Sequence, residues 1–343
     1  MPANLDRVLS CIQPTADMHF GNYFGAVENW VKLQDKYKCI YGIVDLHAIT
    51  IPYEPAALQE NTKRMFIDLM ACGIDPERSI LFVQSLVPEH TELCWIFNST
   101  ASYGELTRMT QFKDKSQQLG ETNEFISAGL FTYPILQAAD ILAYRPKFVP
   151  VGRDQGQHLE LSRNIAQRFN HKYGEYFILP ETLFTETPKI MSLADPSKKM
   201  SKSLGTNHFV VLFEDEEKIR AAVKSAVTDS GDAMAKGEMS PGVANLFEIL
   251  KACGKMAEHK NLMDDFTAKK LKYVHLKQAV SDCLFELAAK LAEKRQEILG
   301  TGKNVEDLMY DMSGEARKIA AETLREVRDL TGLLKHGHDR KKN

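Results

Sequence analysis

Short apolar runs alternate with helical patterns through the first half of the chain. Four runs predict buried strands, at residues 8–12, 39–44, 79–83 and 148–151. Helical patterns lie between and after them, at residues 24–33, 55–71, 89–100, 136–142 and 154–169. Strands that alternate with helices indicate a parallel, doubly wound sheet, whose ligands lie at the carboxyl ends of the strands. We therefore expect an α/β, Rossmann-like domain over residues 1–195.

The pattern changes after about residue 195. Residues 196–206 are polar and rich in lysine and serine, which predicts a loop. Beyond it, strand patterns mostly vanish, and apolar residues recur at helical spacing, for example from Val280 to Leu291. Ser313 is expected to cap a last helix and Gly332 to end it. We therefore expect an α-helical domain over 207–312, followed by a C-terminal helix and basic tail over 313–343.

The composition is that of an ordinary globular protein. The 343 residues are 44% hydrophobic and 26% charged, with a formal charge of −3, which excludes a disordered chain, a collagen-like repeat and a coiled-coil rod. Six scattered cysteines form no C-x-x-C pair, so we expect reduced thiols, no zinc site and a cytoplasmic protein. We expect no signal peptide and no membrane span, because the longest weakly charged stretch, 127–144, is too short and too polar.

Two short motifs suit phosphate groups. The first, Gln13 to Asn22, lies between a predicted strand and a helix, where backbone N–H groups and the helix dipole attract anions. His19 can donate to a phosphate oxygen, and Gly21 keeps the backbone open to a nucleotide. The second, Lys199-Met200-Ser201-Lys202-Ser203, places two mobile cations on a loop, which suits a leaving polyphosphate. Either motif alone is more often an ordinary turn or a solvated loop.

Together and in this order, the two motifs resemble the signature sequences of the class I aminoacyl-tRNA synthetases. The family writes them HIGH and KMSKS, and here they read His19-Phe20-Gly21-Asn22 and Lys199-Met200-Ser201-Lys202-Ser203. Longer stretches narrow the resemblance to the bacterial-type tryptophanyl-tRNA synthetases, at residues 44–50, 73–76, 83–85, 108–116, 138–142, 149–152, 154–155, 191–193 and 226–230. The last hundred residues are similar only in helical character.

The resemblance implies a two-step reaction. The carboxylate of tryptophan attacks the α-phosphorus of ATP, and the acyl group then passes to tRNA(Trp). The implied catalytic residues are His19, Asn22, Lys115, Lys199 and Lys202. ATP would be bound, with Mg²⁺ on its phosphates, by Gln13, Pro14, Thr15, Gly21, Asn22, Gly152, Arg153, Asp154, Ile190, Lys199, Met200, Ser201, Lys202 and Ser203. Tryptophan would be bound by Leu9, His47, Tyr133, Gln137, Asp140 and Gln155. The family also implies a homodimer.

The identity of the amino acid depends on one helix face and on the first strand. Tyr133, Gln137 and Asp140 are spaced to lie on one helix face. Asp140 accepts hydrogen bonds only, which suits an indole N–H, although a phenol could also donate to it. Tyrosine enzymes usually have a tyrosine five residues before the proline of the first signature, where Leu9 stands here. Leu9 therefore favours tryptophan, whereas His47, after a strand, could face the site or merely pack.

Three other functions stay open at this point. They are a tyrosyl-tRNA synthetase of the same fold, a non-catalytic relative that binds tryptophan or tRNA, and a small-molecule nucleotidyltransferase. Lys199 and Lys202 disfavour a non-catalytic module, because such a module handles no pyrophosphate. The helical domain and the long stretches disfavour the nucleotidyltransferase.

The chain departs from the family pattern at Cys11, Thr15, Gln137 and Arg153, and residues 118–124 look like a short insertion. Some relatives bind an iron–sulfur cluster in the helical domain, but only two cysteines lie in that part here, so we expect none. Residues 251–277 carry seven lysines against three acids, and 335–343 carry four basic residues against one acid. Within this family, such local patches predict a track for tRNA phosphates in spite of the negative net charge.

Overall fold

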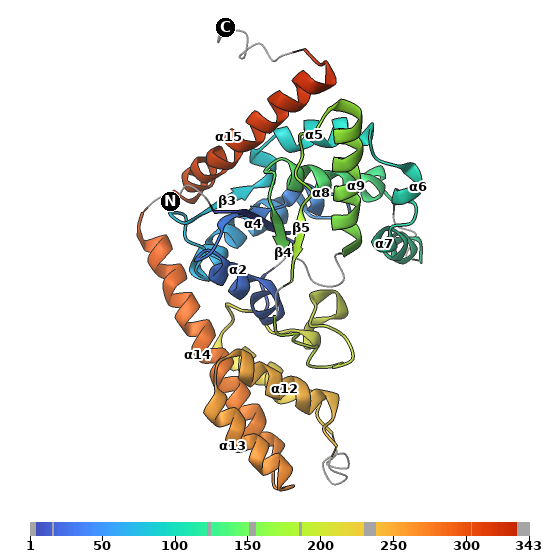
Figure 1. The fold of residues 1–343 in the computed structure, drawn as a ribbon. Helices are drawn as coiled ribbons and strands as arrows, with labels where there is room; N and C mark the ends of the chain where they lie inside the picture. Colours follow the sequence, from blue (N-terminus) through green and yellow to red (C-terminus); the bar gives the residue numbers. More distant parts are fainter. Residues whose placement is uncertain are drawn as a thin grey trace.

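A five-stranded, wholly parallel sheet lies at the centre of the upper part of the molecule (Figure 1). This computed structural model describes residues 5–15, 17–121, 125–150, 156–184, 187–229, 238–302 and 304–334. The strands are β1 (Arg7–Ile12), β2 (Lys38–Ile43), β3 (Ser79–Val83), β4 (Phe148–Pro150) and β5 (Glu181–Leu183). Their order is β3-β2-β1-β4-β5. Because the chain order reverses direction between β1 and β4, a ligand crevice is expected at the carboxyl ends of these two strands.

Helices cover both faces of the sheet. The elements of this part are α1 (Phe20–Asn22), the π-helical turn η1 (Tyr23–Val27), α2 (Glu28–Leu33), α3 (Asp45–Ala48), α4 (Pro55–Ala71), η2 (Gln84–Leu86), α5 (Glu89–Asn98), α6 (Tyr103–Leu106), α7 (Thr110–Glu121), α8 (Ala128–Leu142) and α9 (Gly156–Tyr173). Strand residues alternate between two apolar clusters. Val8 and Tyr41 pack with residues of α2 and α4, whereas Leu9 and Ile40 pack with residues of α5, α8 and α9.

Predicted strands agree with the structure to within one residue, and one strand was not predicted. The missed strand is β5, which has three residues and no buried side chain. The predicted helix at 136–142 is only the second half of α8. Pro134 lies inside that helix, and a proline is ordinarily a signal that a helix ends. The α/β class and the parallel sheet are confirmed.

The second part of the chain is helical, as predicted. Its elements are the short turns η4 (Lys202–Leu204) and η5 (Thr206–His208), then α10 (Glu216–Ser225), α12 (Pro241–Ala252), α13 (Met256–Thr267), α14 (Tyr273–Gly300) and α15 (Val305–Thr331). One apolar cluster runs from the sheet face at Val8 into α12 and α14, at Leu246 and Leu284. This shared core joins the two parts. Within the described residues, no helix is long and apolar enough to cross a membrane.

The last helix, α15, returns to the sheet and covers the edge strand β3 (Figure 1). The hydroxyl of Ser313 accepts from Val83 N at 3.0 Å, and Thr323 donates to Ala143 O at 2.8 Å. Ser313 therefore lies in the middle of the helix, and the prediction that it caps the helix is wrong. Asn304 is the cap, since its side chain accepts from Glu306 N at 2.9 Å. Gly332 ends the helix in the left-handed conformation, as predicted.

Candidate active site at the carboxyl ends of the strands

The first predicted motif forms a tight turn between β1 and α1. His19 caps α1 through a reciprocal pair of bonds, in which Asn22 N donates to His19 Nδ1 and His19 N donates to Asn22 Oδ1, both at 3.2 Å. Because Nδ1 accepts a hydrogen bond, the proton of the neutral ring lies on Nε2. Burial lowers the pKa of His19 to about 4, and the nearby Lys202 and Lys199 act in the same direction. The imidazole is therefore a neutral Nε2–H donor at physiological pH.

The second motif begins on one arm of a small hairpin, whose paired arms are residues 190–192 and 198–200. Met200 N donates to Ile190 O at 3.1 Å, and Ser192 N donates to Lys198 O at 2.8 Å. Asn245 of α12 holds the other strand of the hairpin, because its amide bonds both the N–H and the carbonyl of Met191, at 2.7 and 2.9 Å. The base of this loop is thus fixed to the helical part of the protein.

The fold brings the two motifs into contact. A Cβ built on Gly21 would lie 3.0 Å from Met200 Cβ and 3.0 Å from the His19 ring. Phe20 N donates to Val210 O at 3.0 Å, and Lys202 Nζ lies 3.9 Å from an Asp17 carboxylate oxygen. Gly21 was expected to make room for a nucleotide. In the structure, the atoms that a side chain would crowd are those of the second motif and of His19.

A cavity of about 330 Å³ lies beside the first motif, at the crevice expected between β1 and β4. It is lined by Leu9, Ser10, Cys11, Gln13, Val44, His47, Gln111, Tyr133, Gln137, Asp140, Ile141, Val149 and Pro150. Leu9, His47, Tyr133, Gln137 and Asp140 all belong to the set predicted for tryptophan, and Gln13 belongs to the set predicted for ATP. Cys11 and Gln137, two of the residues that depart from the family pattern, also line this cavity.

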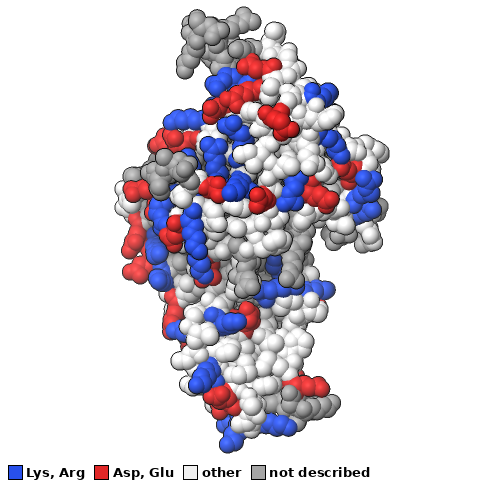
Figure 2. Space-filling view, viewed as in Figure 1, with Lys and Arg blue, Asp and Glu red and all other residues white. Residues whose placement is uncertain are grey.

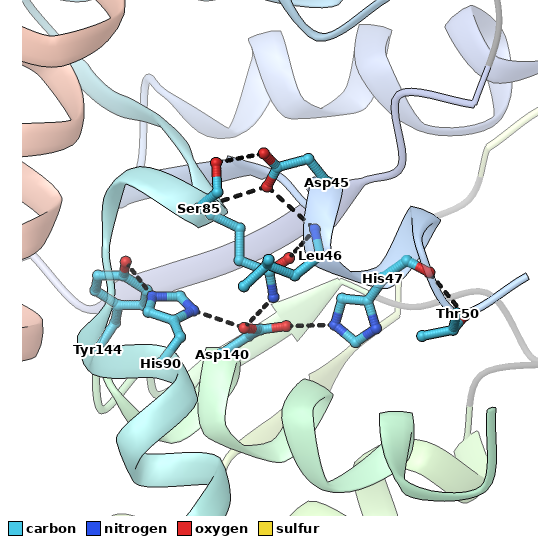
Figure 3. A network of polar contacts seen from close by, with 9 residues as sticks. Asp45, Leu46, His47, Thr50, Ser85, His90, Asp140 and Tyr144 are labelled. Carbon is cyan, nitrogen blue, oxygen red and sulfur yellow. Dashed lines mark hydrogen bonds and ion pairs between the residues drawn. The ribbon is translucent and has the colours of Figure 1, made fainter. Parts of the chain in front are cut away.

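Asp140 is the most heavily bonded group in the cavity wall (Figure 3). Only 2% of the residue is exposed. Its Oδ2 lies 2.7 Å from His47 Nε2, and its Oδ1 lies 2.6 Å from His90 Nδ1 and accepts from Gln84 Nε2 at 2.7 Å. Burial acts to raise the pKa of Asp140, but His47 and His90 outweigh it and hold this pKa below its ordinary value. The carboxylate is therefore ionised and faces the cavity as an acceptor.

Tyr133 is also held by other side chains. Its hydroxyl donates to Gln111 Oε1 at 3.1 Å and lies 2.9 Å from His158 Nε2. Burial raises the pKa of Tyr133 to about 12, so the phenol stays neutral. Gln111 lies within the family-like stretch 108–116, but neither it nor His158 is among the predicted site residues. The position of Gln111 in a family-like stretch is a weak sequence signal for a site residue. His158 has no such signal, because it reaches the site only through the packing of α8 against α9.

Some of the residues predicted for ATP and tryptophan lie outside the described part of the chain. Gly152, Arg153, Asp154 and Gln155 lie outside the described residues, and so does the side chain of Lys115 in α7. Of the other residues predicted for ATP, Thr15, Lys199 and Ser203 are exposed, Ser201 is half-buried, and Pro14 and Ile190 are buried.

Comparison with known proteins agrees with this arrangement. A family model described as tRNA synthetases class I (W and Y) matches residues 4–288. The chain is 44% identical to Tryptophan--tRNA ligase 2 of Streptomyces avermitilis, over 98% of this chain and 100% of that protein. It superimposes on the tryptophanyl-tRNA synthetase of Mycoplasma pneumoniae with a TM-score of 0.85 and 34% identity, covering 98% of this chain and 100% of that one.

A second structure was solved with ligands. The tryptophanyl-tRNA synthetase of Campylobacter jejuni, complexed with ADP and tryptophan, gives a TM-score of 0.82 at 32% identity and covers 95% of this chain and 100% of that one. In parallel α/β sheets, ligands bind at the switch point, where this chain has the turn after β1, the lysine loop and the cavity. The chain belongs to the class I tRNA synthetases of the tryptophan and tyrosine (W and Y) family.

Proposed function

We propose that this chain is a tryptophan--tRNA ligase, which activates L-tryptophan with ATP and transfers it to tRNA(Trp). The observation that carries the proposal is identity of 41–45% to curated tryptophan--tRNA ligases over nearly the whole chain. The site supports the same function, because a buried ionised acceptor, Asp140, and an apolar wall at Leu9 line one cavity.

The first step needs position and charge rather than an enzyme nucleophile. The tryptophan carboxylate attacks the α-phosphorus of ATP and pyrophosphate leaves. His19 would donate from Nε2 to a phosphate oxygen, and Asn22 would assist it from the same turn. Lys199 and Lys202, with Lys115, would neutralise the leaving pyrophosphate. In the second step, the terminal ribose hydroxyl of the tRNA takes the acyl group.

ATP would lie along the contact between the two motifs, with Mg²⁺ on its phosphates. No group of three or more His, Cys, Asp or Glu residues able to hold a metal occurs in the described part of the chain. We therefore assign no protein ligand to Mg²⁺ and derive no step through it.

Tryptophan is favoured over tyrosine by what the cavity offers to each ring. Leu9 is 1% exposed and contributes no hydrogen-bonding group to the wall. The indole ring has one donor, which Asp140 can accept, and otherwise needs apolar contact. We infer that Tyr133 and Gln155 hold the α-amino group and that Gln137 lines the same pocket.

ATP–pyrophosphate exchange tests this function. We expect exchange with tryptophan and none above background with tyrosine or without an amino acid. Exchange with tyrosine alone would establish the tyrosine enzyme instead. Exchange with no amino acid would favour a nucleotidyltransferase, and a complete lack of exchange would favour a binding protein.

The tRNA would contact the helical part. Figure 2 shows Lys and Arg interspersed with Asp and Glu over the face it draws. Among the seven lysines of residues 251–277, Lys255 pairs with Glu286, and Lys277 donates to Lys224 O at 2.9 Å. The other five are exposed. We expect charge reversal at Lys270 and Lys272 to raise KM for tRNA, with a smaller difference from the wild type at higher salt, and to leave tryptophan-dependent exchange unchanged.

We further propose that the active form is a homodimer in the cytoplasm. Trp95 of α5 and Tyr103 of α6 are 77% and 75% exposed, which is unusual for large aromatic side chains. A second copy would cover this surface, and Trp95→Asp should then shift the protein to a monomer in sedimentation velocity. All six cysteines are free thiols, which supports a reducing compartment.

A further inference from the structure

Two buried side chains stand behind Asp140 and do not line the cavity. His90, the second residue of α5, and Tyr144, just after α8, are both 0% exposed. His90 Nδ1 lies 2.6 Å from Asp140 Oδ1, and His90 Nε2 lies 2.7 Å from the Tyr144 hydroxyl (Figure 3). The three groups form a continuous line from the interior of the protein to the cavity wall.

The protons of this line can be assigned from the chemistry of its members. An ionised carboxylate only accepts, so the nitrogen of His90 that faces it must carry a proton. In a neutral imidazole the other nitrogen then has a free lone pair and accepts the proton of Tyr144. Burial raises the pKa of Tyr144 well above its ordinary value, so this phenol keeps its proton to donate.

The imidazole has little freedom to turn. The ring of Phe82 lies 5.5 Å from the ring of His90 and 5.2 Å from the ring of Tyr144, and the latter two rings are 5.4 Å apart. Tyr144 and Asp140 are carried by the end of the same helix, and α5 packs against that helix. The distance between His90 and Asp140 is therefore set by the packing of two helices.

The other oxygen of Asp140 is where a substrate can bind. Oδ1 accepts from both His90 and Gln84, whereas Oδ2 faces His47 alone among the described contacts. Gln84 is fixed in turn, because its Oε1 accepts from Leu46 N at 3.1 Å. An ionised carboxylate has about four lone-pair positions. With three occupied, the fourth is on Oδ2.

We propose that His90 and Tyr144 are a positioning pair, which fixes the rotation of the Asp140 carboxylate so that the fourth lone pair on Oδ2 meets the ring N–H of the amino-acid substrate. The inference rests on the proposed activation of tryptophan. It adds a specificity role for two residues that do not touch the substrate. Removal of either residue lets the carboxylate turn and weakens the bond to the N–H more than the apolar contacts of the ring.

The test compares tryptophan with β-(benzothiophen-3-yl)alanine, in which sulfur replaces the indole N–H. Exchange kinetics would be measured for both amino acids with His90→Leu, His90→Asn and Tyr144→Phe. We expect His90→Leu to lower kcat/KM for tryptophan about 10- to 100-fold, mainly through KM, and to change the value for the analogue little. We expect His90→Asn, whose amide N–H can replace Nδ1–H, to recover most of the preference for tryptophan. We expect Tyr144→Phe to lower kcat/KM for tryptophan about 3- to 10-fold.

The matched control is Tyr41→Phe. Tyr41 is a fully buried tyrosine whose hydroxyl donates to Trp30 O at 2.7 Å, away from the cavity. This variant should lose stability but keep the wild-type preference for tryptophan. Equal losses for both amino acids in His90→Leu, or no rescue in His90→Asn, would overturn the proposal.

If His90→Leu does not fold, Tyr144→Phe decides the question. A preference identical to that of Tyr41→Phe would mean that the pair does not position Asp140. The failure of the wild-type protein to catalyse exchange with tryptophan is a separate result, which would overturn the proposed function itself.

Discussion

Asp140 and Lys202 both serve the proposed reaction, yet the protein holds them in opposite ways. The carboxylate of Asp140 is buried and has three partners at 2.6–2.7 Å. The ammonium group of Lys202 is partly exposed, lies 3.9 Å from Asp17 and sits over the Phe209 ring at 5.4 Å. One group belongs to the packed junction of four elements, and the other belongs to a loop.

The difference matches the role that each group has in the proposed reaction. Recognition of a ring N–H needs one fixed acceptor, and fixing it within the protein core avoids reorganisation when the substrate binds. A leaving pyrophosphate moves during the reaction, so its cation has to follow, as a flexible lysine can. Burial lowers the pKa of Lys202, although Asp17 acts to raise it. The ion pair between Lys202 and Asp17 is long, at 3.9 Å, so we expect a phosphate group to displace Asp17.

The largest effect on exchange is expected from removal of the buried carboxylate of Asp140. Asp140→Ala should lower tryptophan-dependent exchange by about 10⁴-fold, because the substrate N–H and three protein donors lose their acceptor at once. The matched control is Asp68→Ala, which removes another aspartate with 2% exposure, from α4. We expect that control to alter stability far more than exchange. Near-normal exchange by Asp140→Ala would show that the pocket has been assigned to the wrong residues.

Removal of the loop cation Lys202 should lower the rate of exchange rather than the affinity for tryptophan. Lys202→Ala is expected to lower the rate of exchange by about 10²- to 10³-fold, because the variant lacks a positive charge that stabilises the transition state. KM for tryptophan should stay nearly constant. Lys198→Ala, which removes an exposed lysine of the same loop paired with Asp195 at 3.6 Å, is the control. Equal losses in rate and in affinity would indicate a damaged fold instead.

His19, in the first motif beside Lys202, should make the stability of the protein depend on pH. His19 has a folded-state pKa of about 4 against an ordinary value of 6.5, so the unfolded chain binds the proton more tightly. The contribution of His19 to the free energy of unfolding, about 3 kcal/mol, is therefore fully present above pH 6.5. It is lost as the pH falls towards 4. His19→Gln should lack this part of the pH dependence. Urea unfolding at pH 4.5 and 7 measures it, and parallel losses in the two proteins would contradict the assignment.

The smallest effect is expected on KM for ATP, from removal of the carboxylate that pairs with Lys202. Asp17→Asn removes the carboxylate beside Lys202 and should lower KM for ATP by about 2- to 5-fold, because a partly exposed ion pair at 3.9 Å contributes less than about 1 kcal/mol. Initial-rate exchange at varied ATP detects the change. An increase in KM would mean that Asp17 assists ATP instead of competing with it.

Local patterns were reliable where a residue acts through its own segment. The runs at 8–12 and 79–83 are strands because buried parallel strands read as continuous apolar stretches. The signatures at His19 and Lys199 predicted two halves of one site, and the fold brings them together. Prediction failed where a residue serves a distant segment. Ser313 looks like a helix cap, but α15 uses it to bond the backbone of an edge strand 230 residues away.

The cavity shows the same division between near and distant contacts. Tyr133, Gln137 and Asp140 could be placed together because a single helix spaces them. The partners of Asp140 could not, because His47, Gln84 and His90 lie 93, 56 and 50 residues from it in the chain. No periodic pattern records such a distance.

The sequence by itself determined the α/β class, the helical second part, the two signature motifs and the family. These features depend on local periodicity, turn chemistry and short motifs, which are complete within single segments. Only the tertiary structure decided which donors hold Asp140, why Gly21 has no side chain, and that the last helix covers the sheet edge. Each of these depends on the packing of elements distant in sequence, where burial makes every unpaired polar group costly and so selects its partner.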